Sequence, residues 1–159
     1  MGTGKTTVGS LLARRLGRPF IDLDQQVELH TGEPIADTFS RGGEEAFRRI
    51  ERSALTAVIE QNDGPVVALG GGTLLDPNLR NQVRNAGPLL TLDAPLSTIE
   101  ARLTGDQSRP LLQERSLEDI CAERATAYTD VDCVVDAGID EPELVAEAIE
   151  RVLSLRGVS

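Results

Sequence analysis

Hydrophobic positions follow two patterns along the chain, one typical of helices and one typical of buried strands. Apolar residues recur at helical spacing over 8–16, and Gly17 then supplies a stop. Residues 43–61 repeat the helical pattern with a long apolar face. By contrast, 66–69 is a continuous apolar run of the kind found in parallel strands buried on both faces. The chain is therefore expected to contain both kinds of element.

Strands and helices are expected to alternate from one end of the chain to the other. This order predicts one domain over 1–159, with an α/β fold in which helices flank a parallel sheet. The segment 104–114 is polar and shows no periodicity, so it is interpreted as a mobile loop or lid. Strands are predicted at 19–24, 66–69, 89–93 and 133–136, and helices at 8–16, 25–31, 35–39, 43–61, 78–85, 95–103, 116–126 and 140–155.

Composition narrows the class of protein. The 159 residues are 40% hydrophobic and 26% charged, which are ordinary values for a globular domain. A net charge of −10 argues against a nucleic acid or an anionic membrane as partner. Cys121 and Cys133 have no metal-like spacing and are interpreted as reduced thiols. We expect a cytoplasmic protein that works as a monomer.

The first residues carry the clearest chemical signal. Gly2-Thr3-Gly4-Lys5-Thr6 matches the second half of the phosphate-binding pattern G-x-x-x-x-G-K-[ST]. Glycines let successive N–H groups turn toward an anion, and the helix that follows points its positive end there. Lys5, the only lysine, can reach the phosphates, and the Thr6 hydroxyl can bind Mg²⁺. The alternative is a glycine-rich turn before an ordinary helix.

Two further candidates follow predicted strands. Asp22 and Asp24 end the first strand on the same face, because side chains alternate with period two. Ligands bind at the carboxyl ends of strands in open α/β sheets, so one acid could hold Mg²⁺ through water and the other could act on a substrate hydroxyl. The glycine run 70–72 after a buried strand indicates close backbone approach to a ligand. The alternatives are solvated carboxylates and a tight turn.

Three arginines are candidates for binding anions. Arg48 lies three residues before Glu51, on the same face of a long predicted helix. Arg109 lies in the lid, where it could reach a transferring phosphoryl group, and Arg124 lies on the next helix. The alternative for Arg48 is an exposed ion pair, and for the other two a solvated surface arginine.

Taken together, these segments resemble the shikimate kinase family. The resemblance covers nearly the whole chain, in the order and spacing of that family. A single phosphate loop would be a weak signal, but six further segments in order are specific. The matching segments are G-T-G-K-T-T-V-G at 2–9, F-I-D-L-D at 20–24, T-G-E-P-I-A-D-T-F at 31–39, G-E-E-A-F-R-R-I-E at 43–51, L-G-G-G at 69–72, S-R-P-L-L at 108–112 and E-R-A-T-A-Y at 123–128.

The resemblance implies roles on the nucleotide side of the reaction. It implies ATP and Mg²⁺ as cofactors, and a P-loop kinase fold whose sheet has the strand order 2-3-1-4-5. Lys5 matches the catalytic lysine on the phosphates, and Arg109 matches the lid arginine. Thr6 matches the residue whose hydroxyl binds Mg²⁺, and Asp22 matches the acid that holds Mg²⁺ through water. The nucleotide-binding residues implied are Gly2, Thr3, Gly4, Lys5, Thr6, Thr7, Arg102 beside the adenine, and Arg109.

The resemblance also implies an acceptor site in the helical region 24–51 and beyond. Asp24 matches the acid that contacts the shikimate hydroxyls and acts as base. Arg48 and Arg124 match the arginines that hold the shikimate carboxylate. Gly70, Gly71 and Gly72 match a run whose backbone touches shikimate, and Phe39 and Phe47 match apolar walls. The reaction implied converts ATP and shikimate to ADP and 3-phosphoshikimate, in aromatic amino-acid biosynthesis.

Other assignments remain open. A gluconate kinase of the same fold is the nearest alternative, a nucleoside monophosphate kinase is a more distant one, and a non-catalytic nucleotide-binding protein is the alternative from another class. The family's first strand and the opening of its phosphate loop have no counterpart here. We therefore expect that Met1 is a misplaced start, and that the natural chain begins roughly ten residues earlier with an apolar strand and G-x-x-G-T-G-K-T. Without that strand we expect poor expression and little activity.

Overall fold

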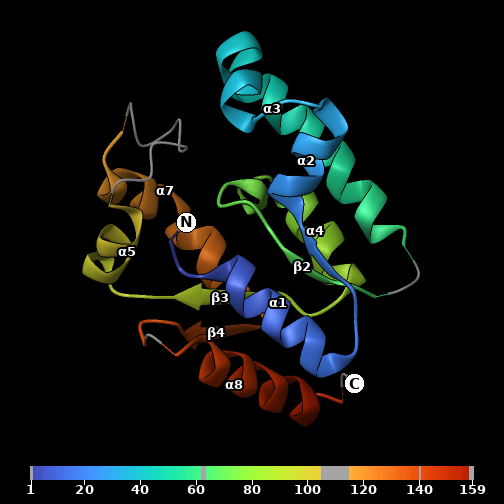
Figure 1. Ribbon diagram of the computed structural model, residues 1–159, viewed down its shortest axis with the longest axis vertical. Coiled ribbons are helices and arrows are strands. Elements are labelled where there is room, and N and C mark those ends of the chain that lie inside the picture. Colours follow the sequence, from blue (N-terminus) through green and yellow to red (C-terminus); the bar gives the residue numbers. More distant parts are fainter. Residues whose placement is uncertain (1, 62–63, 105–114, 140, 158–159) are drawn as a thin grey trace.

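Helices and strands alternate as the sequence predicts (Figure 1). The computed structural model describes residues 2–61, 64–104, 115–139 and 141–157. The predicted lid at 104–114 lies outside these residues except for Thr104. In chain order the elements are α1 (Lys5–Leu16), β1 (Phe20–Asp22), α2 (Leu23–Thr31), α3 (Ile35–Ile59), β2 (Val66–Ala68), the 3-10 helix η1 (Thr73–Leu75), α4 (Pro77–Ala86), β3 (Leu90–Asp93), α5 (Leu96–Leu103), α7 (Leu117–Thr129), β4 (Cys133–Asp136) and α8 (Pro142–Leu155).

The strands form two parallel pairs. β1 pairs with β2, with Phe20 opposite Val66, and β3 pairs with β4, with Leu90 opposite Cys133. The described residues thus hold two separate two-stranded sheets. Both pairs are neighbours in the predicted order 2-3-1-4-5, with β1 and β2 as strands 2 and 3 and β3 and β4 as strands 4 and 5. In β2 only Ala68 is buried, because β2 has a single neighbour among the described strands.

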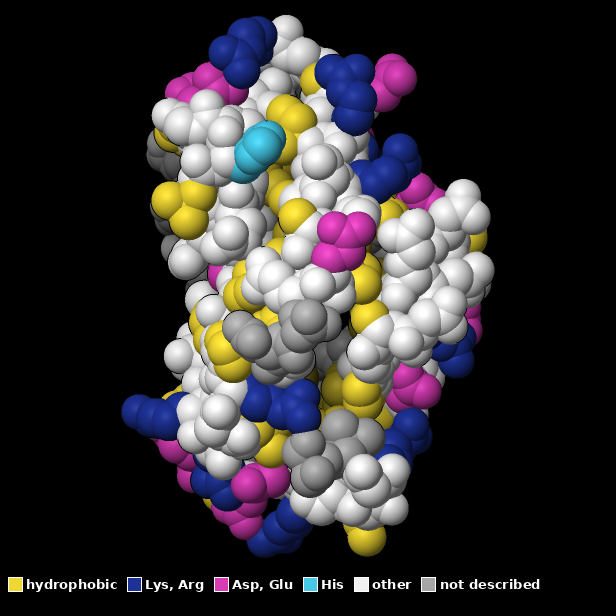
Figure 2. Space-filling model, turned by 90° about the vertical axis from the view of Figure 1, so that its right-hand side faces the viewer, with side chains coloured by type: hydrophobic (Ala, Val, Ile, Leu, Met, Phe, Trp, Pro, Cys, Tyr) yellow, Lys and Arg dark blue, Asp and Glu magenta, His cyan; other side chains and the backbone are white. Residues whose placement is uncertain are grey.

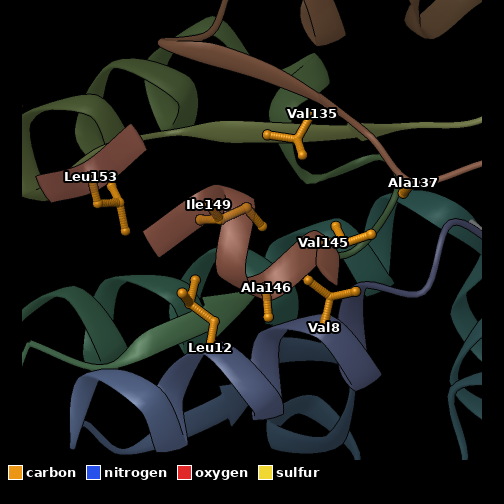
Figure 3. Packing of buried hydrophobic residues seen from close by; sticks show 8 residues of the cluster. All are labelled: Val8, Leu12, Val135, Ala137, Val145, Ala146, Ile149 and Leu153. Atoms are coloured by element: carbon orange, nitrogen blue, oxygen red, sulfur yellow. The ribbon is translucent and has the colours of Figure 1, made fainter. Parts of the chain in front are cut away.

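Helices cover both faces of the strands, as expected for an α/β fold. On one face α1 and α8 pack against each other, α1 also packs against β1 and β2, and α8 packs against β4. Figure 3 shows Leu12 and Val8 of α1 pointing toward Ala146, Ile149 and Val145 of α8. Leu90 and Leu92 point into this cluster, whereas Leu89 belongs to a cluster with Ala127 of α7, because neighbouring residues of a strand face opposite sides.

The helices near the top of Figure 1, α2 and α3, pack against each other. Buried Leu23 and Leu55 join them to Leu79 of α4. Two helices were predicted, at 35–39 and 43–61. The single element α3 covers both and is divided by a kink at Gly43, where φ is 69° and ψ is −175°, so the prediction of two helical segments is confirmed. No helix of the described part of the chain is long and apolar enough to cross a membrane.

Candidate active site

The loop before α1 has the backbone shape of an anion-binding site. Gly2 and Gly4 have positive φ values, 70° and 85°, which glycine adopts without strain. Gly4 is the N-cap residue of α1, no side chain among the described residues caps the helix, and its first turn holds no acid. The N–H groups at this helix start, and the positive end of the helix dipole, can therefore face a phosphate.

Thr6 and Asp22, the residues predicted to hold Mg²⁺, lie side by side. The Thr6 hydroxyl donates a hydrogen bond to Asp22 Oδ2 at 2.6 Å. The remaining oxygen of Asp22 accepts the backbone N–H of Asp24 at 3.0 Å. A hydroxyl and a carboxylate that complete a phosphate-bound ion suit Mg²⁺, so the pair fits the predicted metal. In the described ranges no group of three or more His, Cys, Asp or Glu could hold a metal.

Asp24 reaches the site from a helix, so its predicted position at a strand end is wrong. β1 ends at Asp22, and Asp24 lies in the first turn of α2. The prediction continued the strand's period of two through Asp24, but the side chain of Asp22 caps α2 and starts the helix at Leu23. Asp22 and Asp24 still line one cleft.

This cleft has a volume of about 400 Å³ and runs from the phosphate loop to the end of β4. Arg102, on α5, lies at its edge. Its Nη1 donates to the carbonyl of Ala137 at 3.1 Å and its Nη2 to that of Ile139 at 3.2 Å. These bonds hold Arg102 beside the backbone that follows β4. The cleft is lined by Gly2, Thr3, Gly4, Lys5, Thr6, Thr7, Val8, Asp22, Asp24, Ala68, Leu69, Gly71, Arg102, Leu103, Ala137, Ile139, Pro142 and Val145.

Arg48 is held by two acids and an aromatic ring. Its Nη1 donates to Glu51 at 2.8 Å and its Nη2 to Glu44 at 2.9 Å. Its Cζ lies 5.1 Å from the centre of the Phe47 ring, which packs against the Phe39 ring at a tilt of 35° with centroids 4.8 Å apart. Burial alone would lower the pKa of Arg48, but the charges and hydrogen bonds of Glu51 and Glu44 outweigh it and raise that pKa. The guanidinium is therefore a fixed positive charge.

Glu51 is fully buried, so the alternative of an exposed ion pair between Arg48 and Glu51 is wrong. Its relative exposure is 0%, and Thr73, at 1%, donates its hydroxyl to Glu51 Oε1 at 2.6 Å. With Arg48 on the other oxygen, both carboxylate oxygens are satisfied. The sequence did contain a signal for this burial. Glu51 lies one helical turn after Phe47 and one turn before Leu55, on the buried face of α3. A glutamate on an apolar face requires a partner.

Arg124 and Tyr128 approach the glycine run from α7. Arg124 is 5% exposed, so the alternative of a solvated surface arginine is wrong for it. The Tyr128 hydroxyl donates to the carbonyl of Gly71 at 2.7 Å. Burial raises the pKa of Tyr128, and the charges of Arg124 and Arg48 oppose that shift. Both arginines therefore lie near one hydroxyl, although they come from different helices.

The structure thus brings the predicted residues of the described chain into two neighbouring groups. The nucleotide group surrounds the cleft, and the acceptor group surrounds the glycine run; Gly71 and Asp24 belong to both. Arg109 lies outside the described residues. Sequence reasoning missed Thr73 and Tyr128 as members of the site. Tyr128 falls within a segment used for the resemblance, but nothing in its spacing pointed to the carbonyl of Gly71.

Comparison with known proteins places the chain in one family. The family model for shikimate kinase matches residues 1–154. A shikimate kinase of Geobacter sulfurreducens is 42% identical over 152 residues, covering 92% of this chain and 83% of that protein. A shikimate kinase of Persephonella marina is 34% identical and covers 96% of this chain and 94% of that protein.

Solved structures agree. A shikimate kinase from Acinetobacter baumannii in complex with shikimate has a TM-score of 0.91 and 29% identity, covering 100% of this chain and 91% of that chain. The enzyme from Aquifex aeolicus has a TM-score of 0.82 and 35% identity, covering 99% and 92%. A gluconokinase from Sinorhizobium meliloti, at 17% identity and a TM-score of 0.53, shares the fold alone. The chain therefore belongs to the shikimate kinase family, whose members are phosphotransferases.

Proposed function

We propose that this enzyme transfers the γ-phosphoryl group of ATP to the 3-hydroxyl of shikimate, as part of aromatic amino-acid biosynthesis. The observation that carries the proposal is the convergence of two arginines, the half-buried Arg48 and the buried Arg124, on the glycine run beside the phosphate loop. Such a pair suits a small hydroxylated acid held by its carboxylate. The family assignment and the relative with bound shikimate support the same substrate.

On the nucleotide side, the backbone of the phosphate loop and Lys5 hold the phosphates of ATP. Thr6 and Asp22 would hold Mg²⁺, which neutralises charge on the β- and γ-phosphates when bound. Arg102 lies where it can border the adenine, since its guanidinium is tied to the backbone after β4. Arg109 is proposed from the sequence as the arginine that meets the transferring group.

On the acceptor side, Arg48 and Arg124 bind the carboxylate, and Phe39 and Phe47 form an apolar wall. The oxygen of the 3-hydroxyl attacks the γ-phosphorus, and Asp24 accepts the proton that this hydroxyl loses. The new O–P bond forms as the bond from that phosphorus to the β,γ-bridging oxygen breaks, and ADP leaves. Little covalent chemistry falls to the protein, so positioning and charge neutralisation do most of the work.

The nearest alternative acceptor is gluconate. An assay of ADP release with shikimate, with gluconate and without acceptor separates the alternatives directly. Release only with shikimate supports the proposal, release with gluconate favours the related kinase, and no release with any acceptor favours a non-catalytic binding protein. No nucleic acid or membrane partner is proposed; charges of both signs are interspersed on the face in Figure 2.

The carboxylate clamp has its own test. Arg48→Ala should cost about 2–5 kcal/mol of shikimate binding, because a charge-assisted contact is lost. Arg49→Ala, an exposed neighbour on the same helix, is the matched control and should leave binding unchanged. Calorimetry measures the binding of each ligand. If Arg48→Ala weakened the binding of ATP and of shikimate equally, Arg48 would not be the residue that binds the shikimate carboxylate.

The setting of the reaction is also part of the proposal. We place it in the cytoplasm, where ATP is available and where Cys121 and Cys133 would stay as free thiols, as the structure has them. We propose that the enzyme acts as a monomer. Sedimentation of the purified protein with and without shikimate checks that, and a stable dimer would contradict it.

A further inference from the structure

Backbone angles do not explain why residues 70–72 are glycines. In the described chain the glycines with positive φ are Gly2, Gly4, Gly17, Gly32, Gly43, Gly64 and Gly157, and none of them belongs to this run. Gly72 has φ −112° and ψ −3°, which other residues can adopt. The absence of side chains at 70–72 therefore has another cause.

The cause is steric, because an added Cβ would clash with a neighbouring side chain. That side chain differs between Gly71 and Gly72. A Cβ on Gly72 would lie 2.6 Å from Cζ and 2.9 Å from Nη1 of Arg48, and closer still to Nη2. A Cβ on Gly71 would lie 2.5 Å from Nη1 of Arg124 and 3.5 Å from the Tyr128 oxygen. Real Cβ atoms essentially never come closer than 3.0 Å to such neighbours. Because Gly71 and Gly72 have no Cβ, the guanidinium groups of Arg124 and Arg48 can occupy the space next to them.

We propose that Gly72 and Gly71 are positioning residues for the acceptor site: they seat the guanidinium groups of Arg48 and Arg124. The inference rests on the proposed function, in which these arginines bind the carboxylate of shikimate. It gives the run a role in addition to the contact between its backbone and shikimate that the resemblance implies. Gly72 and Gly71 act through the arginines.

The geometry indicates which group gives way when a methyl is added. The crowded atoms at 71 and 72 are the ends of long, flexible arginine side chains that come from other helices. The backbone at Gly72 accepts alanine, so the guanidinium moves and the fold persists. A shift of the clamp by about 1 Å is enough to lose much of the binding that depends on fixed geometry.

Gly87 provides a matched control. It follows α4, its φ of 173° is extended, and a Cβ there would meet nothing within 4 Å. Gly87→Ala makes the same chemical change in open space. Its shikimate KM, ATP KM and melting temperature should equal those of the parent enzyme.

The first measurement compares three alanine variants by ADP release. Gly72→Ala should raise the shikimate KM about tenfold or more while the ATP KM changes less than about twofold. Gly71→Ala should have a smaller effect of the same kind, because only one atom of Arg124 is strongly crowded. A Gly72→Ala enzyme that keeps the parent's shikimate KM, or that fails to fold, would overturn the proposal, since the arginine would not have given way.

A double-variant cycle shows whether the glycine acts through Arg48. In Arg48→Gln the side chain ends one atom before the position of Cζ, so none of the three crowded atoms remains. Adding Gly72→Ala to that variant should then change shikimate affinity less than about twofold. An equal loss in both backgrounds would show that the methyl meets the substrate directly, and would overturn the seating role.

The same cycle separates this inference from the clamp it rests on. If Arg48→Gln alone keeps full shikimate affinity, the clamp is wrong, whatever the glycine variants do. If Arg48→Gln loses affinity but Gly72→Ala is equally harmful with and without Arg48, the clamp stands and the seating role is wrong. Loss in the parent background together with tolerance in Arg48→Gln supports both.

Discussion

The nucleotide side and the acceptor side of this enzyme are built by opposite means. The nucleotide side uses backbone amides at the start of α1, with the exposed Thr6 and partly exposed Lys5 beside them. The acceptor side uses charged side chains inside the protein: Glu51 is 0% exposed and Arg124 is 5% exposed. The phosphates of the nucleotide can therefore be bound by backbone amides and exposed side chains, which cost the protein little folding free energy. The acceptor's carboxylate is met by charges that the protein must itself hold in place.

This contrast makes a general expectation about variants. Losing a nucleotide-side group removes an interaction with the ligand and leaves the fold intact. Losing an acceptor-side group also strands a buried partner, so the fold weakens with the function. The four substitutions below test this expectation, in order of decreasing effect.

The largest effect is expected at Glu51. Glu51→Ala leaves Arg48 without its buried partner and Thr73 without its acceptor, which should cost about 3–5 kcal/mol of stability. Glu44→Ala is the matched control, since Glu44 binds the same arginine but its side chain is 50% exposed. It should cost less than about 1 kcal/mol. Urea unfolding of the two variants checks the difference, and similar losses would end the contrast between the two sides.

Lys5→Met should show the reverse pattern. Removing one charge that stabilises the transferring phosphoryl group is expected to lower kcat by about 10²–10³. The melting temperature should stay close to that of the parent, because Lys5 is partly exposed at the first position of α1. Calorimetric binding of shikimate should also persist. A large loss of stability in this variant would show that the nucleotide side, too, is structurally held.

Gly70→Ala should differ from the variants at 71 and 72. A Cβ on Gly70 would lie 2.6 Å from Glu51 Oε1, 2.9 Å from Asp24 Oδ1 and 3.0 Å from Thr73 Oγ1. Glu51 and Thr73 are buried and bonded to each other, so they cannot move aside as an arginine end can. The expected cost is about 1–3 kcal/mol of stability, as for other overpacked sites. Thermal unfolding next to Gly87→Ala measures it; an unchanged midpoint would contradict the prediction.

The smallest effect is expected at Tyr128. Tyr128→Phe keeps the ring and loses the hydrogen bond to Gly71, a change of about 0.5–1.5 kcal/mol. The pH dependence carries a sharper signature. Because burial raises the folded pKa of Tyr128 above its unfolded value of about 10, its contribution to stability is complete below that pH and is lost as pH rises through the folded pKa.

Calorimetric unfolding of the parent and of Tyr128→Phe between neutral and strongly alkaline pH checks both parts. The gap between the two proteins should be constant below about pH 10 and should close above it. A gap that widens with rising pH would mean that the tyrosine is ionised in the fold.

The two sides also differ in how far the sequence predicted them. The nucleotide loop is contiguous, so 2–6 alone indicated an anion site. The acceptor side is assembled from 48–51, 70–73 and 124–128, which meet only when α3, the glycine run and α7 pack together. The resemblance supplied Arg48 and Arg124, but their supports, Thr73 and Tyr128, depend on contacts that no local spacing encodes.

The elements themselves were largely predicted, because each had its own local signal. Gly17 ends α1 in the left-handed conformation, and Ser116 caps α7 by accepting the N–H of Asp119. The error at Asp24 arose where two local rules competed. A strand's alternation and a helix cap both applied at Asp22, and the cap prevailed because it satisfies the N–H groups at the start of α2.

The hydrogen bond from Tyr128 to Gly71 has a practical consequence. Tyr128 is the only tyrosine of the chain, and the chain has no tryptophan. Near-ultraviolet emission excited above the phenylalanine band therefore comes from a single ring, tied to the carbonyl of the glycine that faces Arg124. The protein carries its own fluorophore at the acceptor site, so an acceptor that disturbs the glycine run can be followed in real time, without a label and without turnover.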